Sequence, residues 1–153
     1  MNRSNVTIVD KGFDAIFKEL SKANATGTKV GLFAEDRSAD GRYNMATLGL
    51  LQEEGVGKIP ARDFMKSTAI KHQDDMGVRM EQYIGGVIDR KRTMKQALEA
   101  TGSSYVRYTK DVITKFSTPP NAPYTVKKKG RNDPLVDTGK MRDSIKHKIT
   151  GRF

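Results

Sequence analysis

Asp137 is the residue whose type and neighbours most directly suggest chemistry, because it stands in the stretch Pro-Leu-Val-Asp-Thr-Gly at 134–139. A carboxylate at the start of such a turn can share one proton with a second carboxylate, and the pair can activate water for peptide hydrolysis. The stretch occurs once in the chain. Two copies of the chain would therefore have to bring their Asp137 side chains together.

The rest of the sequence argues against a protease of this kind. An aspartic protease needs a flap and a β-rich barrel, but residues 140–153 are too few to supply them and the preceding chain is largely helical in pattern. A simpler interpretation is that Asp137 or Thr138 caps a short helix, with Gly139 inside the turn. We therefore expect an architectural role and no catalytic residue.

No other group of residues predicts an enzyme, a cofactor or a metal site. His72 and Asp75 have the i, i+3 spacing of helical metal ligands, but they lack a third ligand, so a solvated helical face is expected. The absence of cysteine excludes disulfides, thiol catalysis and zinc–thiolate sites. A P-loop, a GxGxxG motif and a Ser/His/Asp set are also missing.

The charge of the chain is +10 and is concentrated near its end. Residues 124–153 contain nine Lys/Arg and three Asp, a net charge of +6. A basic surface of this kind can contact nucleic acid or an acidic protein partner, and it can equally be a set of solvated turns. The candidate contact residues are Lys127, Lys128, Lys129 and Arg131, with a second basic cluster at 89–92.

The hydrophobic pattern predicts one α+β domain over residues 1–153, with a small antiparallel or mixed sheet packed with two long helices and shorter ones. Asp63 is expected to cap the first long helix. No run is apolar enough to span a membrane or to act as a signal peptide. The predicted strands are 6–10, 28–34, 124–130 and 145–150, and the predicted helices are 11–20, 43–55, 64–90, 93–116 and a turn within 137–145; 35–42 is a loop and 117–124 an extended connector.

Two distant segments, 29–69 and 117–145, together resemble the tail-completion or neck proteins of tailed bacteriophages. The first segment has a Lys-Val-Gly strand, a helix ending at Glu-Gly, and the turn Ile-Pro-Ala-Arg-Asp-Phe. The second has a proline-containing connector, a Lys-Gly turn and the stretch Pro-Leu-Val-Asp-Thr-Gly-Lys-Met-Arg-Asp-Ser-Ile. The positions that carry the resemblance as an assembly motif are Ile59, Pro60, Arg62, Phe64, Pro134, Leu135, Asp137, Thr138, Gly139, Met141, Arg142 and Ile145.

The resemblance implies a structural protein of the virion, assembled in the host cytoplasm and placed at the junction of head and tail. It implies a homo-oligomeric, hexameric ring between the connector and the tail tube, with genomic DNA passing along its axis. The partners would then be neighbouring connector or adaptor and tail-tube or terminator proteins, without a membrane. The alternative suggested by the charge is a basic nucleic-acid-binding or DNA-packaging accessory protein.

Overall fold

The structure is a computed structural model that describes residues 10–38 and 40–151. The strand predicted at 6–10 lies, apart from Asp10, outside the described residues. The elements are α1 (Phe13–Ser21), a 3-10 turn η1 (Lys22–Ala25), β1 (Gly27–Gly31), α2 (Met45–Glu54), α3 (Phe64–Ile88), α4 (Met94–Lys115), α5 (Pro123–Lys129), α6 (Lys140–Asp143) and β2 (Lys146–Thr150).

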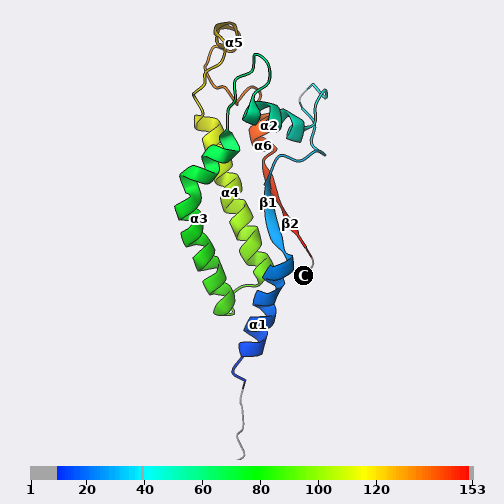
Figure 1. Ribbon diagram of the computed structural model, residues 1–153, viewed down its shortest axis with the longest axis vertical. Coiled ribbons are helices and arrows are strands. Elements are labelled where there is room, and N and C mark those ends of the chain that lie inside the picture. The colour runs from blue at the N-terminus through cyan, green and yellow to red at the C-terminus, as the bar shows by residue number, and fades with distance from the viewer. Residues whose placement is uncertain (1–9, 39, 152–153) are drawn as a thin grey trace, which may run out of the picture.

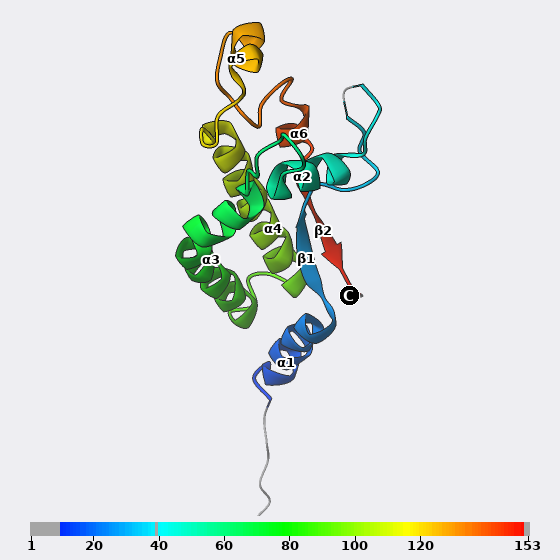
Figure 2. The ribbon, with the colours of Figure 1, turned by 45° about the horizontal axis from the view of Figure 1, so that its top comes forward.

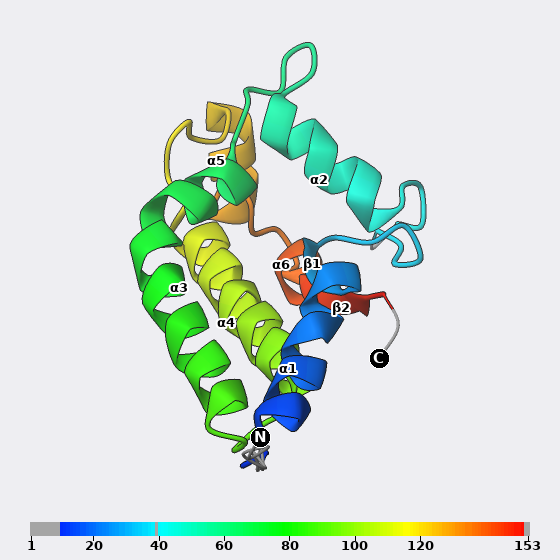
Figure 3. The same ribbon diagram turned by 60° about the horizontal axis from the view of Figure 1, so that its bottom comes forward.

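Helix α4 forms the middle of the molecule. Helix α3 packs along one side of it, and the two-stranded sheet packs along the other (Figure 1). The view from below shows the same order, with α1 at the end of the helix pair where α3 connects to α4 (Figure 3). Strands β1 and β2 are antiparallel, from Gly27 opposite Thr150 to Gly31 opposite Lys146. The predicted α+β class, with two long helices and a small antiparallel sheet, is confirmed.

The sheet lies close to α4 because the helix has a glycine where the strands cross it. A Cβ atom on Gly102 would lie 2.6 Å from the imidazole ring of His147 and 2.7 Å from Thr28 Oγ1. A larger residue would therefore push the sheet away. The first turn of α4 is fixed by a capping box, in which Thr93 Oγ1 accepts the Gln96 N–H and Gln96 Oε1 accepts the Thr93 N–H.

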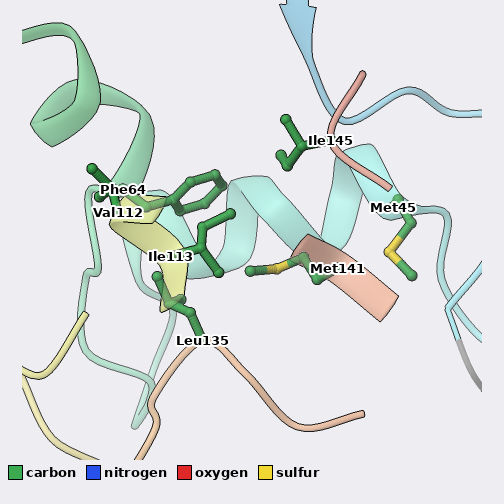
Figure 4. Close-up of a cluster of buried hydrophobic side chains, with 7 residues drawn as sticks. All are labelled: Met45, Phe64, Val112, Ile113, Leu135, Met141 and Ile145. Carbon is green, nitrogen blue, oxygen red and sulfur yellow. The ribbon is translucent and has the colours of Figure 1, made fainter. Parts of the chain in front are cut away.

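The main hydrophobic core joins residues from both halves of the sequence. Figure 4 shows these side chains gathered from α2, α3, α4, the segment before α6, α6 itself and the link from α6 to β2. All of them are buried, so the core links the long helices to the short ones and removes apolar surface from water. Its members are Met45, Phe64, Val112, Ile113, Leu135, Met141 and Ile145.

A second cluster closes the opposite end of the helix pair. Val87, Met94 and Ala97 are buried there, and Leu20 of α1 packs against them. The Glu19 carboxylate accepts the Met94 N–H at 2.8 Å, so α1 also satisfies the start of α4. The other apolar residues of α1 are not all covered, since Phe13 and Phe17 are 71% and 64% exposed.

The strand predicted at 124–130 is wrong, because this segment forms helix α5. Pro123 occupies the first turn, where its missing N–H costs nothing, and Gly130 ends the helix with φ 70°. Tyr124 and Val126 favour a strand, but no strand of the described residues pairs with this segment. The local helix signals therefore determine its conformation. The extended connector accordingly ends at Ala122, and α5 projects from the body (Figure 2).

Candidate functional site

The two segments of the resemblance meet at Arg62, which is buried between them. Its guanidinium donates to Gln52 Oε1 at 2.9 Å and to the carbonyls of Pro119 and Pro120 at 3.2 and 3.1 Å. All three acceptors are neutral. Burial lowers the pKa of the Arg62 guanidinium, so holding its charge here has a desolvation cost that the three hydrogen bonds offset. Arg62 thus ties the turn before α3 to the connector after α4.

The turn that leads to Arg62 is shaped by Gly55. Its φ is 71°, and a Cβ atom there would lie 2.5 Å from the Ala61 backbone nitrogen. The chain between them folds back on itself, with Val56 and Ile59 paired in an isolated bridge. Ile59 and Pro60 of the predicted motif are therefore exposed at the tip, whereas Arg62 and Phe64 point inward and are buried.

The start of α3 is capped by Glu53, and the expected cap from Asp63 is wrong. The two oxygens of the Glu53 carboxylate accept the backbone N–H groups of Met65 and Lys66 at 2.9 and 3.0 Å. Asp63 stands at the N-cap position, but its side chain accepts the Ser67 hydroxyl and no backbone N–H of the helix. A carboxylate from α2 can do this work because α2 and the turn place it beside the free N–H groups of the first turn.

The stretch 134–145 is mostly part of the core. Arg142, half-buried, pairs with the exposed Asp143 at 2.8 Å, and that hydrogen bond raises the pKa of Arg142. Asp137 and Thr138 are exposed. The remaining positions of this part of the motif are buried: Pro134, Leu135, Gly139, Met141 and Ile145. The motif residues are thus chiefly the ones that attach this stretch to α2, α3 and α4.

The expected cap of α6 by Asp137 is wrong. Gly139 is the N-cap residue and has the left-handed φ of 84°, without a side-chain cap hydrogen bond. Thr138 Oγ1 accepts the Lys140 N–H at 3.3 Å, but Thr138 precedes the N-cap residue Gly139, so this bond closes the turn and does not cap the helix as expected. Asp137 is fixed through its backbone instead, because its carbonyl accepts a hydrogen bond from Arg131. The conformation of the turn therefore depends on glycine more than on a carboxylate.

A groove of about 380 Å³ lies between this turn and the start of α2. Its buried lining includes Met45, Leu135 and Met141, and its charged side chains include Asp40 and Asp137. The Ser38 hydroxyl, 2.6 Å from Asp40, lowers the pKa of that carboxyl and keeps it ionised. The turn runs from α5 to α6, and the sheet of the described residues has the two strands β1 and β2.

The four candidate basic residues divide into two pairs. Lys129 Nζ donates to the carbonyls of Asp133 and Val136 at 2.8 and 2.6 Å, and Arg131 pairs with Asp133 at 3.0 Å. These two are occupied in holding the loop after α5. Lys127 and Lys128 are exposed and make no ion pair or hydrogen bond to the described part of the chain. The cations available to a partner are therefore these two.

The sequence suggested that His72 lies on a solvated helical face, and this prediction is wrong. Its ring stacks on Tyr108 of α4 at 4.1 Å and 6°, and it is half-buried. The Tyr108 hydroxyl bonds to Asp75, and Arg79 pairs with the same carboxylate at 3.1 Å. Across the described residues, no group of three or more His, Asp or Glu side chains is arranged to hold a metal ion. This cluster joins α3 to α4.

Comparison with known proteins gives no relative: no family model, no curated protein and no solved structure matches the chain. Within the described residues, no helix is both long enough and apolar enough to cross a membrane.

The contacts of two residues near the junction were not predicted from the sequence. Gln52 and Glu53 are adjacent at the end of α2; Gln52 reaches Arg62 in the turn that follows, and Glu53 reaches the first turn of α3. The sequence pattern that could have predicted these contacts is two polar residues followed by a turn with glycine and proline, directly before a long helix. Such a turn brings the end of one helix back to the exposed N–H groups of the next.

Proposed function

We propose that this protein is a structural component of a tailed-phage virion, a tail-completion or neck protein that forms a ring at the head–tail junction. The observation that supports this best is the Arg62 junction. The two segments on which the resemblance depends meet between residues more than 50 positions apart, because the buried Arg62 donates hydrogen bonds to the carbonyls of Pro119 and Pro120. Motif residues that hold together a shared unit favour an architectural role over a catalytic one.

The surface of the protein also favours assembly. Large apolar side chains are exposed on α1, α2 and α3, including Phe13, Phe17, Leu50 and Val78. Apolar patches of this kind usually mark surfaces that another protein covers. In a ring each subunit contacts its neighbour head to tail, so two different patches must be complementary.

The test is a phage that lacks this protein. It should accumulate DNA-filled heads and complete tails that do not join, and supplying the protein in trans should restore infectious particles. Electron microscopy of the lysate shows whether heads and tails are joined, and plaque counts measure the infectious particles. Normal numbers of joined, infectious particles without the protein would refute the proposal.

A second candidate is a basic DNA-binding or packaging accessory protein. One observation favours it: residues 117–132 contain four Lys/Arg and no acidic residue. Such binding would weaken steeply with salt, since it releases counterions from the phosphates. Retention on DNA at 50 mM salt that is lost by about 200 mM would support this candidate. Failure to bind at low salt would remove it.

A further inference from the structure

We propose that α5 of one copy docks on the outer face of α3 in the next copy, and that this contact builds the ring. The inference rests on the proposed ring and names the surfaces that form it. Three described features carry it: the free face of α5, the uncovered face of α3, and the opposite charges of the two.

Helix α5 presents an aromatic and basic face to solvent. Tyr124, Lys127 and Lys128 have the i, i+3, i+4 spacing that puts side chains on one side of a helix. Tyr124 is 77% exposed, and no residue of α5 is buried. The helix is nevertheless held in place, because Lys129 is bonded to two carbonyls and the Asn121 N–H donates to Asn132 Oδ1. A positioned helix with a free face suits docking on a partner.

The outer face of α3 is apolar and acidic. Asp74, Val78 and Glu81 follow one another at i, i+4 and i+7, so they share one stripe. Val78 is 54% exposed, and Ile70 and Ile88 extend the same stripe in both directions. Within the described residues, the ion pair of α3 is that of Asp75 with Arg79, which leaves Asp74 and Glu81 without a cation.

The charges of the two faces are opposite in a chain that is basic overall. Residues 72–88 carry three acids and one arginine, a net charge of −2, whereas 117–132 carry +4. Docking would place the Tyr124 ring on Val78 and the two ammonium groups beside Asp74 and Glu81. Those acids are separated by about 10 Å along the helix, at 1.5 Å per residue, so the Tyr124 ring fits between them. Complementary charges of this kind select the partner and its register.

Both surfaces are left open by the subunit itself. In the ribbon, α3 runs along one side of the molecule and α5 projects from one end (Figure 1, Figure 2). The contact uses two different patches, so it is head-to-tail, and repetition closes a ring when the rotation per subunit permits.

Charge reversal in both surfaces tests the contact. Lys127→Glu with Lys128→Glu should abolish the ring, and Asp74→Lys with Glu81→Lys should do the same. Native mass spectrometry of the purified protein measures the ring, and particle assembly in phage extracts measures its function. Combining all four changes should restore the ring. Lys29→Glu with Lys95→Glu is the matched control, since it changes the charge equally at exposed lysines of β1 and α4, and its ring should be normal.

A crosslink reports the contact directly, because the chain has no cysteine of its own. Tyr124→Cys with Val78→Cys should give a ladder of covalent oligomers under mild oxidation in assembled particles, and either cysteine alone should not. If the charge-reversed variants form normal rings and the double-cysteine protein gives no ladder, the contact is refuted, while the head–tail function stands or falls by the deletion phage. If reversal at 127 and 128 abolishes DNA retention at low salt and leaves the ring intact, α5 binds nucleic acid and the proposal is overturned.

Discussion

The carboxylate of Glu53 accepts the backbone N–H of Met65 at 2.9 Å, across a turn that contains the predicted assembly motif. Glu19 does the same for Met94 at the start of α4. Each long helix therefore begins at a carboxylate supplied by a shorter helix. The short helices are thus attached to the long ones by hydrogen bonds to charged groups, which are stronger than neutral ones, as well as by packing.

Removing the Glu53 carboxylate should destabilise the protein. We expect Glu53→Ala to lower the free energy of unfolding by about 0.5–2 kcal/mol, because two N–H groups of α3 lose their acceptor. Urea unfolding followed by circular dichroism measures the change. Glu54→Ala is the control, since Glu54 is the exposed neighbour on the same helix. Equal stability of the two variants would show that Glu53 is not a cap.

Arg62→Lys should loosen the connector. Lysine keeps the charge, but its donors share one nitrogen, whereas three different nitrogens of the Arg62 guanidinium bond the three acceptors. We therefore expect a loss of about 1–3 kcal/mol and faster hydrogen exchange at the Asn121 amide. The comparison is Arg37→Lys, which changes an exposed arginine in the same way. Unchanged exchange at Asn121 in the Arg62 variant would refute the role assigned to the junction.

Gly102→Ala should separate the sheet from α4. The added methyl would lie 2.6 Å from the His147 ring, and such overpacking typically costs about 1–3 kcal/mol. Gly77→Ala is the opposite case, since nothing lies within 4 Å of its added Cβ, and it should stabilise α3 by up to about 1 kcal/mol. Thermal unfolding should shift in opposite directions for the two variants. A stabilised Gly102 variant would contradict the packing described.

The turn at 137–139 gives a paired prediction. Asp137→Ala should change the free energy of unfolding by less than about 0.5 kcal/mol, because the Asp137 side chain caps nothing. Gly139→Ala should cost about 1 kcal/mol or more, because φ is 84° there. Chemical denaturation of both variants distinguishes them. A larger loss for Asp137→Ala than for Gly139→Ala would restore the capping account.

Acid should weaken the attachment of β2 through Glu35. Hydrogen bonding from Lys148 lowers the pKa of Glu35 from 4.5 to about 2. A carboxyl with a lowered folded-state pKa stabilises the fold above its unfolded value and loses that contribution as the pH falls toward 2. Glu35→Gln should therefore flatten the pH dependence of stability between pH 4.5 and 2. Glu99→Gln serves as the control, and an identical pH dependence in the Glu35 variant and the unmodified protein would refute the assignment.

The sequence predicted the parts of the fold that have long, regular patterns. The two long helices and both described strands follow from the spacing of their apolar residues. The segment 124–130 was predicted wrongly because Tyr124, Thr125 and Val126 favour a strand locally, while Pro123 and Gly130 favour a short helix. Only the partner strand decides between them, and a sequence does not show which strands meet.

The sequence predicted which residues belong to the candidate site better than it predicted what each of them does. Arg62, Leu135, Met141 and Ile145 were named, and all four are buried contacts between the segments. The role expected for Asp137 belongs to Gly139, and the role expected for Asp63 belongs to Glu53. Side chains that act across ten or more residues of sequence leave no periodic signal, which explains why the contacts of Glu53 and Gln52 were not predicted.

The pairing of β1 with β2 constrains the order in which the chain can fold. Gly31 lies opposite Lys146, so all of α2, α3 and α4 must be synthesised before β1 meets its partner strand. Contacts this distant in sequence form late and slow the folding of small domains. On the ribosome, the helix pair can associate first, while β1 waits with its edge unpaired. A subunit therefore acquires its finished sheet only after its helical surfaces are already formed, and prematurely terminated chains lack it.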